Sequence, residues 1–222
     1  MMTEKASCLE DLELNYKNPH HPISFAGISK IQRYYNGILS VSDIEKFLST
    51  KDFYITHREV KKPSPRNPTY AYSIRTQIQV DLCQISNVKR HNNNYSWMLC
   101  AIDTFSRKAF IRLMRTKTAD ETLSSLKSIL QEAKKMPKSI AADRGSEIKN
   151  RKVAEFCGKN NIKLIFCDTY KSAAIVERFQ LSIQRRIYKW MTSNNSLSFY
   201  KSLDDILRGY NNSHHRTIGY IC

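Results

Sequence analysis

Three acidic residues, Asp81, Asp143 and Glu177, are the side chains with the clearest potential for chemistry in this sequence. Asp81 interrupts an apolar run, where an unpaired charge is costly to bury and therefore needs a partner such as a metal ion. Asp143 follows a second apolar run, and strand ends commonly carry functional side chains because the sheet holds their loops in place. Carboxylate oxygens are the ligands that Mg²⁺ prefers. A metal-dependent site is therefore one interpretation, and ordinary solvated carboxylates are the other.

Glu177 belongs to residues 172–191, whose side-chain pattern predicts one long helix. With a rotation of about 100° per residue, this helix has an apolar face, a polar stripe beside it and a basic stripe beyond. The apolar face contains Ile175, Val176, Phe179, Ile183, Ile187 and Trp190, the polar stripe Glu177, Gln184 and Tyr188, and the basic stripe Arg178, Arg185 and Lys189. This order suits a metal site beside a DNA backbone, although an amphipathic helix with solvated charges explains it as well.

The segments that must position these acids predict an α/β domain, residues 77–222, with a mixed sheet flanked by helices. Apolar residues alternate over 77–83, whereas 97–102 is continuously apolar, so the first strand has two different faces and the second is covered on both sides. A third strand at 109–113 follows a short turn and completes an antiparallel meander. Beyond it we expect a helix from the capping box Thr118–Glu121 to Pro137, strands at 139–142 and 162–166, and helices at 149–158, 172–191 and 199–210.

The first third of the chain predicts three shorter parts. Residues 1–24 lack a pattern, and we expect a flexible terminus. Residues 25–60 predict a small helical domain, with a break at Gly37 and a capping box at Ser42–Glu45. This domain suits either a helix-turn-helix that contacts DNA or a plain helical hairpin. Residues 61–76 are basic and rich in proline, which predicts an extended linker that also suits a phosphate backbone or nuclear import.

The composition favours a polyanionic partner. Thirty-six Lys and Arg against 20 Asp and Glu give a formal net charge of +16, more than solubility requires, so nucleic acid is the leading candidate. A membrane partner is not expected, because the sequence contains neither an apolar span nor a basic amphipathic helix with a bulky apolar face near a terminus. The six cysteines form no C-x-x-C pair, which favours reduced intracellular thiols.

Several motifs occur in the order found in the retroviral-type integrase and transposase family, and the chain resembles that family from about residue 25 to 219. The likeness is greatest to integrases of Maverick/Polinton elements and virophages. The matching motifs are Gln79–Leu82, Ala101–Arg107, Asp143–Glu147, Lys171–Phe179 and Tyr210–Gly219. The resemblance implies a ribonuclease H-like fold with a five-stranded sheet and with Asp81, Asp143 and Glu177 gathered on one edge.

The resemblance also implies an activity and its partners. Asp81, Asp143 and Glu177 would hold two Mg²⁺ or Mn²⁺ ions for 3′-end processing and strand transfer into double-stranded target DNA. The expected phosphate contacts are four cationic residues on or just before the predicted helix, namely Lys171, Arg178, Arg185 and Lys189. A homo-oligomer is expected, acting in the nucleus of a eukaryotic host or in a viral particle.

The sequence departs from the family pattern in several places. Only 33 residues separate Asp143 from Glu177, slightly fewer than is usual, and the segment Phe179–Ile183 lacks the Asn-Arg-Thr that usually follows the family's glutamate. No paired His and Cys of a zinc-binding N-terminal domain is found. Asp103 and Glu147 are rival ligands, although Asp103 is better suited to capping the turn before Ser106. The alternative functions are a catalytically idle or domesticated DNA-binding relative and a ribonuclease H-like nuclease.

Overall fold

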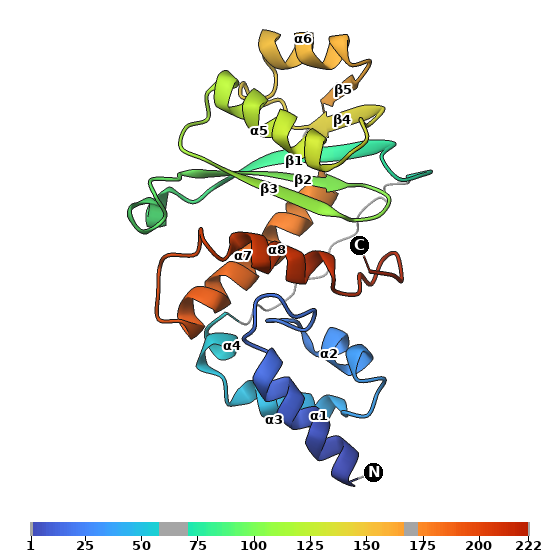
Figure 1. Ribbon diagram of the computed structural model, residues 1–222, viewed down its shortest axis with the longest axis vertical. Helices are drawn as coiled ribbons and strands as arrows, with labels where there is room; N and C mark the ends of the chain where they lie inside the picture. The colour runs from blue at the N-terminus through green and yellow to red at the C-terminus, as the bar shows by residue number, and fades with distance from the viewer. Residues whose placement is uncertain (1, 58–70, 167–172, 222) are drawn as a thin grey trace. The chain divides into compact units, whose positions relative to one another are not determined.

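The computed structural model of the 222-residue chain describes residues 2–57, 71–166 and 173–221 (Figure 1). The chain divides into two compact units, one formed by residues 1–67 and 183–222 and the other by residues 68–182. We call the first the helical unit and the second the sheet unit. The boundary at residue 183 falls inside α7 (Ala174–Ser193), so the first half of this helix belongs to the sheet unit.

The sheet unit contains a mixed five-stranded sheet with the strand order β3-β2-β1-β4-β5. The first three strands form the predicted antiparallel meander, and β4 and β5 are parallel to β1. The strands are β1 (Gln77–Gln84), β2 (Trp97–Asp103), β3 (Ala109–Met114), β4 (Ser139–Ala142) and β5 (Lys163–Phe166). This architecture confirms the fold class expected from the sequence.

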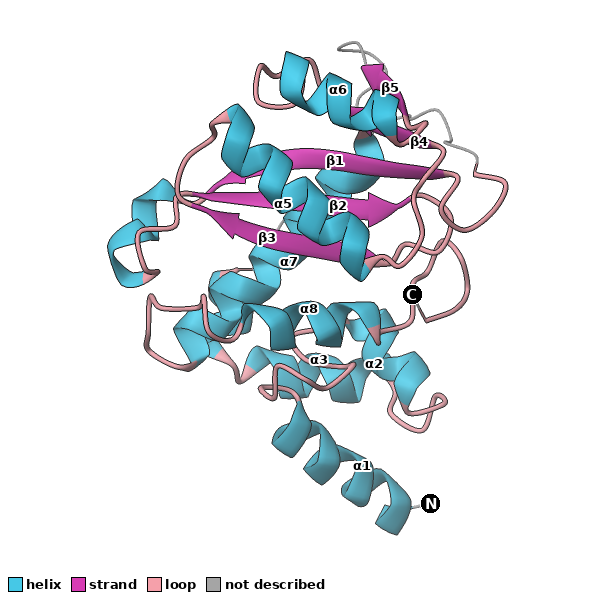
Figure 2. Ribbon diagram, turned by 45° about the horizontal axis from the view of Figure 1, so that its top comes forward, coloured by secondary structure: helices cyan, strands magenta, loops and turns pink. Residues whose placement is uncertain are grey.

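The two faces of β1 have different surroundings. Ile78 and Val80 are buried in a hydrophobic core that also contains Leu126 and Ile129 of α5 (Ala119–Glu132) and Val153 of α6 (Arg151–Lys159). Successive side chains of a strand point to opposite faces, so Gln79 and Asp81 lie on the other side of the sheet. Figures 1 and 2 show α5 across one face and the beginning of α7 on the opposite face.

The helical unit contains all or part of six helices. They are α1 (Met2–Asn15), α2 (Ile28–Tyr34), α3 (Val41–Ser49), α4 (Asp52–Thr56), the second half of α7 and α8 (Leu203–Asn211). Leu12, Ile31, Leu48 and Phe53 are among the buried residues of its core, and Trp190 of α7 packs against them. Residues 183–222 therefore belong with the N-terminal helices, whereas the sequence placed them in the same domain as the strands.

The prediction that residues 1–24 are flexible and unfolded is wrong, because α1 lies within them. Leu12 and Tyr16 are almost fully buried, and the Tyr16 hydroxyl donates a hydrogen bond to the Ala26 carbonyl at 3.0 Å. The capping box also begins two residues earlier than expected, since Ser40 rather than Ser42 caps α3 together with Asp43. The expected break at Gly37 is present, with a positive φ of 79°.

Among the described residues, none of the helices combines the length and the apolar character needed to cross a membrane. Cys83 and Cys100 are buried thiols in β1 and β2, in keeping with their apolar surroundings in the sequence. Most of the predicted linker, residues 61–70, lies outside the described residues.

Candidate active site

The pairing of β1 with β4 brings Asp81 and Asp143 next to each other. In this parallel pair Val80 lies opposite Ala142, so the residues that follow them, Asp81 and Asp143, are neighbours at the carboxyl end of β4. Adjacent strands lie about 4.8 Å apart, which places the two acids on neighbouring backbones. Asp143 is exposed at the end of its strand, whereas Asp81 is partly buried within β1.

Gln79 joins β1 to the helix that carries Glu177. Its side-chain Oε1 accepts hydrogen bonds from the backbone N–H groups of Ile175 at 3.0 Å and Val176 at 3.1 Å. The first N–H groups of a helix have no partner within the helix, so Gln79 satisfies two of them in α7. Gln79 and Asp81 lie on the same face of β1, and Glu177 follows directly after Val176. This contact therefore holds Glu177 on the side of the sheet where Asp81 lies.

Asp81 is the group whose ionisation shows most clearly that the three acids are close together. Its pKa is raised to about 6, first by burial and further by repulsion from Asp143 and Glu177. Two interactions oppose the rise: the Leu82 backbone N–H donates to Asp81 Oδ1 at 2.8 Å, and the Gln180 side chain stabilises the carboxylate. Three carboxylates thus interact within one region of the sheet unit.

Gln180, one helical turn after Glu177, lies between Asp81 and its cross-strand neighbour Cys100. Its side chain lowers the pKa of Asp81 and of Cys100, although burial, the largest cause, leaves both values above normal. The buried Nε2 atom makes no hydrogen bond of regular geometry, so the hydrogen bonding by which this side chain stabilises the Asp81 carboxylate is distorted.

The donor set fits a divalent cation, because all three groups offer carboxylate oxygens and a cation would relieve their mutual repulsion. Among the described residues, however, no three His, Cys, Asp or Glu side chains are close enough together to hold one metal ion. Asp81 Oδ1 is instead occupied by the Leu82 N–H. Asp81, Asp143 and Glu177 therefore form an electrostatic cluster whose side chains must turn toward one another to share a ligand.

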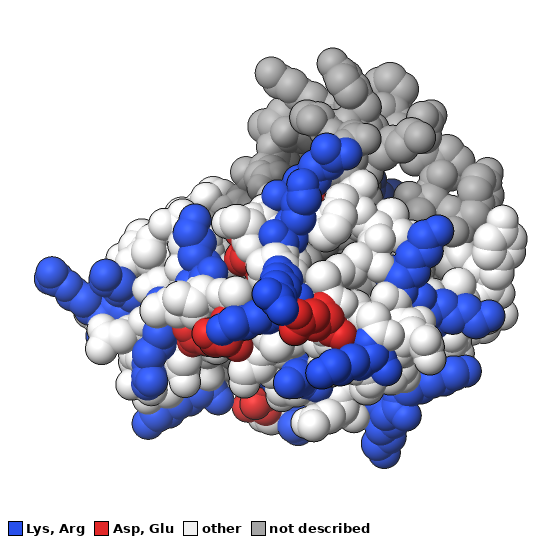
Figure 3. Space-filling view, turned by 90° about the horizontal axis from the view of Figure 1, so that it is seen from above, with Lys and Arg blue, Asp and Glu red and all other residues white. Residues whose placement is uncertain are grey.

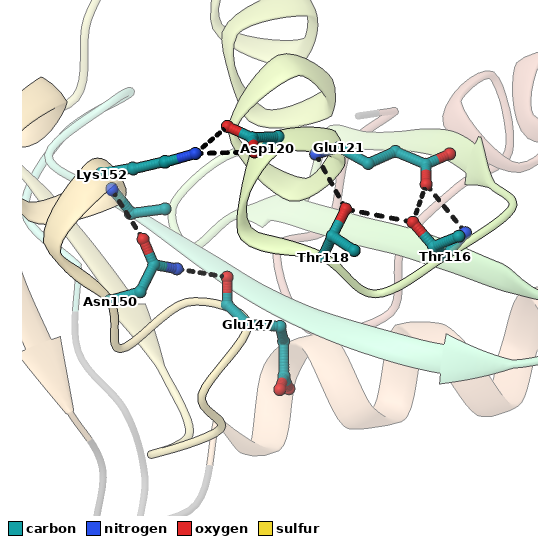
Figure 4. Close-up of polar contacts among 8 residues, drawn as sticks. Thr116, Thr118, Asp120, Glu121, Glu147, Asn150 and Lys152 are labelled. Atoms are coloured by element: carbon teal, nitrogen blue, oxygen red, sulfur yellow. Dashed lines mark hydrogen bonds and ion pairs between the residues drawn. The ribbon is translucent and has the colours of Figure 1, made fainter.

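The loop after Asp143 is held by a small set of polar contacts (Figure 4). Asn150 caps α6 by accepting from the Val153 N–H at 3.0 Å, and its Nδ2 donates to the Glu147 carbonyl at 2.8 Å. The ion pair between Lys152 of α6 and Asp120 of α5 ties the two helices together at 2.5 Å. These contacts fix the position at which the chain leaves β4 and returns to the core.

The two rival acids have other roles in the structure. Asp103 is fully buried, and its Oδ2 accepts from the Ser106 N–H at 3.1 Å and the Ser106 hydroxyl at 2.6 Å, which confirms that it caps this turn. Its other oxygen accepts from the Arg75 N–H at 3.1 Å. The Glu147 carboxylate lies over Gly145, where a Cβ atom would come within 2.1 Å of Glu147 Oε1.

The predicted phosphate contacts have different surroundings. Arg178 is exposed on the sheet-unit half of α7, and Arg185 is partly exposed in the helical unit. Lys189 is only 8% exposed, with its ammonium 3.4 Å from the Phe25 carbonyl and over the Tyr54 ring, so it is unsuited to bind phosphate. The helical wheel placed Lys189 in a basic stripe because it omits residues distant in sequence that cover the helix. Lys171 lies outside the described residues.

Sequence reasoning missed Gln79 and Gln180 as parts of this site. Gln79 had a detectable signal, because it is a polar residue in an apolar strand two positions before Asp81 and so shares its face. Gln180 was noticed only as a departure from the family pattern. Its contact with Asp81 had no signal in the sequence, since it depends on how α7 lies on the sheet.

Comparison with known proteins identifies the class to which the sheet unit is related. Residues 74–172, just under half of the chain, match the family described as Integrase core domain. A transposon-derived protein of Caenorhabditis elegans is 30% identical over 135 residues, which cover 61% of this chain and 47% of that protein. The chain thus spans about half the length of this curated relative.

Solved structures show the same fold at low sequence identity. The catalytic core domain of HTLV-2 integrase in complex with magnesium, in its trimeric form, has a TM-score of 0.56 at 19% identity and covers 66% of this chain and 93% of its own. A chain of the simian T-cell lymphotropic virus intasome in complex with PP2A regulatory subunit B56 gamma has a TM-score of 0.59 at 17% identity, covering 83% and 68%. The mixed sheet with its flanking helices is therefore a ribonuclease H-like integrase core fold. The family match and the relative support a function of the integrase and transposase type.

Proposed function

We propose that this protein is a DNA integrase or transposase that trims the 3′ ends of an element's DNA and joins them to target DNA. The observation that carries this proposal is geometric: β1 and β4 place Asp81 and Asp143 on neighbouring strands, and Gln79 docks the helix that bears Glu177 on the face of β1 where Asp81 lies. Acids that are partly buried and close together repel one another, and such clusters occur preferentially at functional sites. Cleaving and joining phosphodiesters with bound divalent cations is a function that needs such a cluster.

Asp81, Asp143 and Glu177 are the proposed catalytic residues and the proposed ligands of two Mg²⁺ or Mn²⁺ ions. When bound, such ions neutralise the scissile phosphate and lower the pKa of the attacking oxygen. The protein itself positions the three acids. β1 and the end of β4 hold the two aspartates on neighbouring strands, and Gln79 docks the helix that bears Glu177. Magnesium in the HTLV-2 core structure supports this choice of ion.

Double-stranded DNA, both the element ends and the target, is the proposed substrate. The face drawn in Figure 3 carries many Lys and Arg side chains and only a few acidic ones. Arg178 and Arg185 remain proposed phosphate contacts, as does Lys171, whereas Lys189 is withdrawn because it is buried. Contacts of this kind lower affinity as salt rises and add little base specificity.

The biological setting is a further part of the proposal. The motif likeness to Maverick/Polinton and virophage integrases supports a mobile element or virus as the source of the DNA. Action in a eukaryotic nucleus or a viral particle, and assembly as a homo-oligomer, follow from the same likeness. The intasome and the trimeric core among the similar structures support assembly into oligomers.

A strand-transfer assay tests the proposal with the full chain, duplex oligonucleotides that match the element's ends, and Mg²⁺ or Mn²⁺. The wild type is expected to produce both trimmed 3′ ends and joined products, and Asp143→Asn is expected to lose both. Glu155→Gln is a matched control, because this exposed α6 carboxylate pairs only with Arg151 at 2.6 Å and such surface pairs contribute little.

The assay separates the competing functions by its products. Trimming without joining would indicate a ribonuclease H-like nuclease instead. Binding of the oligonucleotides without either reaction would indicate a catalytically idle, DNA-binding relative. Full activity in Asp143→Asn would remove the proposed mechanism, whatever products were formed.

A further inference from the structure

The connection between β1 and β2, residues 85–96, presents an exposed basic surface that the proposed function leaves unused. Lys89, Arg90 and His91 are exposed at the end of the short 3-10 helix η1 (Ser86–His91). Arg115 and Lys117, in the turn after β3, are also exposed. We call these five residues the basic hairpin surface. No acidic residue occurs between Asp81 and Asp103 or between Asp103 and Asp120 in the sequence.

Internal hydrogen bonds order the connection between β1 and β2 and hold these side chains in place. Asn92 is fully buried, its Nδ2 donates to the Val88 carbonyl at 2.9 Å, and its backbone N–H donates to the Lys89 carbonyl at 3.0 Å. Asn93 and Asn94 take positive φ values of 50° and 59°, which asparagine tolerates better than most residues and which close the turn. The basic side chains therefore project from an ordered base.

Two aromatic side chains organise the neighbouring cations. The Arg115 guanidinium lies 5.3 Å from the centre of the Tyr95 ring, and the Lys117 ammonium lies 5.3 Å from the centre of the Trp97 ring. Such cation–π contacts orient a cation without neutralising its charge. The nearby Glu121 carboxylate accepts hydrogen bonds from the backbone N–H groups of residues 115 and 116, so it is engaged with the turn.

The basic hairpin surface lies at the end of the sheet toward which the carboxyl end of β4, followed by Asp143, points. Trp97 pairs with Gln84 on one side and with Met114 on the other. The end of β1, the start of β2 and the end of β3 therefore lie at the same end of the sheet. Since β4 is parallel to β1, its carboxyl end, followed by Asp143, points the same way. Figure 1 shows the β1–β2 connection projecting beyond this end of the sheet.

We propose that the basic hairpin surface binds the phosphate backbone of duplex DNA and holds the duplex at the end of the sheet toward which Asp143 points. This inference rests on the proposed function, because it assigns part of the DNA binding to the basic hairpin surface. Five cationic or titratable side chains are exposed on the two turns, and the one acidic residue described beside them, Glu121, is engaged with the backbone of its own turn, so the surface suits a polyanion such as a phosphate backbone.

The test compares two pairs of substitutions in the full chain that remove equal charge at opposite ends of the strands in the sheet unit. Lys89→Ala with Arg90→Ala removes two cations from the surface. Lys135→Ala with Lys138→Ala removes two exposed cations before the start of β4, which lies at the opposite end of the strands. Binding of a fluorescent duplex oligonucleotide is measured by anisotropy over a series of salt concentrations, with EDTA present so that no reaction occurs.

The hairpin pair is expected to weaken binding on the order of tenfold at physiological salt and to reduce the slope of log affinity against log salt by roughly 2, one for each lost phosphate contact. The control pair is expected to leave the slope nearly unchanged. Equal losses from both pairs would mean that net charge alone attracts DNA and would overturn the inference, as would wild-type binding by the hairpin pair. Because binding is measured without catalysis, a failure of strand transfer would refute the proposed function while leaving this result intact.

Discussion

Replacing Gln79 by methionine is the most direct perturbation of the link between Asp81 and Glu177. Methionine has nearly the same length and volume as glutamine but offers no comparable acceptor. The substitution therefore removes the two hydrogen bonds that Gln79 Oε1 accepts from the Ile175 and Val176 N–H groups, at 3.0 and 3.1 Å, while keeping the site filled. Gln79 itself is only 3% exposed, so water cannot easily take the place of the lost oxygen.

The size of the effect follows from these two bonds. Leaving a buried N–H without a partner costs about 1 to 3 kcal/mol, and the open end of a helix allows some relaxation. We expect Gln79→Met to lower the free energy of unfolding by roughly 2 to 4 kcal/mol, which a domain of ordinary stability survives. A shift of α7 by about 1 Å would also move Glu177 and cost on the order of 100-fold in rate.

Two measurements separate positioning from simple instability. Chemical denaturation gives the free energy of unfolding, and strand transfer at increasing Mg²⁺ gives the concentration needed for half-maximal rate. If Gln79 positions Glu177, the variant needs more Mg²⁺ at a temperature where it is fully folded. Gln79→Glu keeps an acceptor at the same distance but adds a buried carboxyl group beside Asp81, so it is expected to recover only part of the lost stability, and less at high pH than at low pH.

Gln77→Met is the matched control, since Gln77 lies on the same strand and the same face, and its side chain makes no hydrogen bond to any described residue. Its stability and Mg²⁺ requirement should stay close to those of the wild type. The reasoning fails if Gln79→Met is as stable as Gln77→Met and needs no more Mg²⁺ than the wild type.

Further predictions concern charge at the site and along α7. Asp81→Asn should abolish strand transfer yet raise the free energy of unfolding at pH 7, because burial and the other acids lift the Asp81 pKa to about 6. That shift corresponds to at most about 3 kcal/mol, and partial exposure reduces the expected gain to roughly 1 to 2 kcal/mol. The gain should be full above pH 6 and should disappear as pH falls toward 4, since wild-type Asp81 then becomes protonated; denaturation at several pH values checks this. Mn²⁺ should raise the melting temperature of the wild type more than that of Asp81→Asn, measured by calorimetry. Lys189→Met should leave DNA affinity unchanged, whereas Arg178→Ala should weaken it about threefold to tenfold in an anisotropy titration. Gly145→Ala should leave the rate of strand transfer close to that of the wild type, because its Cβ would meet only the end of the flexible Glu147 side chain, and a large loss of rate would contradict this reading of the loop.

Local patterns were sufficient to predict the sheet and the positions of its acids. Strand alternation predicted β1, and the apolar run that ends at Asp143 predicted β4 with the bounds observed. The turn formed by Asp103 and Ser106 was also foreseen, because its hydrogen bonds join residues three apart. Each of these features depends on side-chain period or on neighbours in the sequence, so the information lies within a few residues.

The features that the sequence left open depend on contacts between distant residues. Residues 1–24 gave no helical pattern, yet α1 forms because its buried side chains pack with residues from later helices. Lys189 looked exposed on a helical wheel, but Phe25 and Tyr54 cover it. The grouping of residues 183–222 with the N-terminal helices likewise requires the folded chain.

The same division applies to the candidate site. The sequence by itself determined which acids to consider and that each lies in or beside a regular element, because strand and helix periods are local. Only the tertiary structure decided that Asp81 is partly buried beside Asp143 and Glu177, and that Gln79 caps the helix bearing Glu177. Burial, electrostatic repulsion and hydrogen bonds act through space, and the distances they depend on exist only after β1, β4 and α7 have come together.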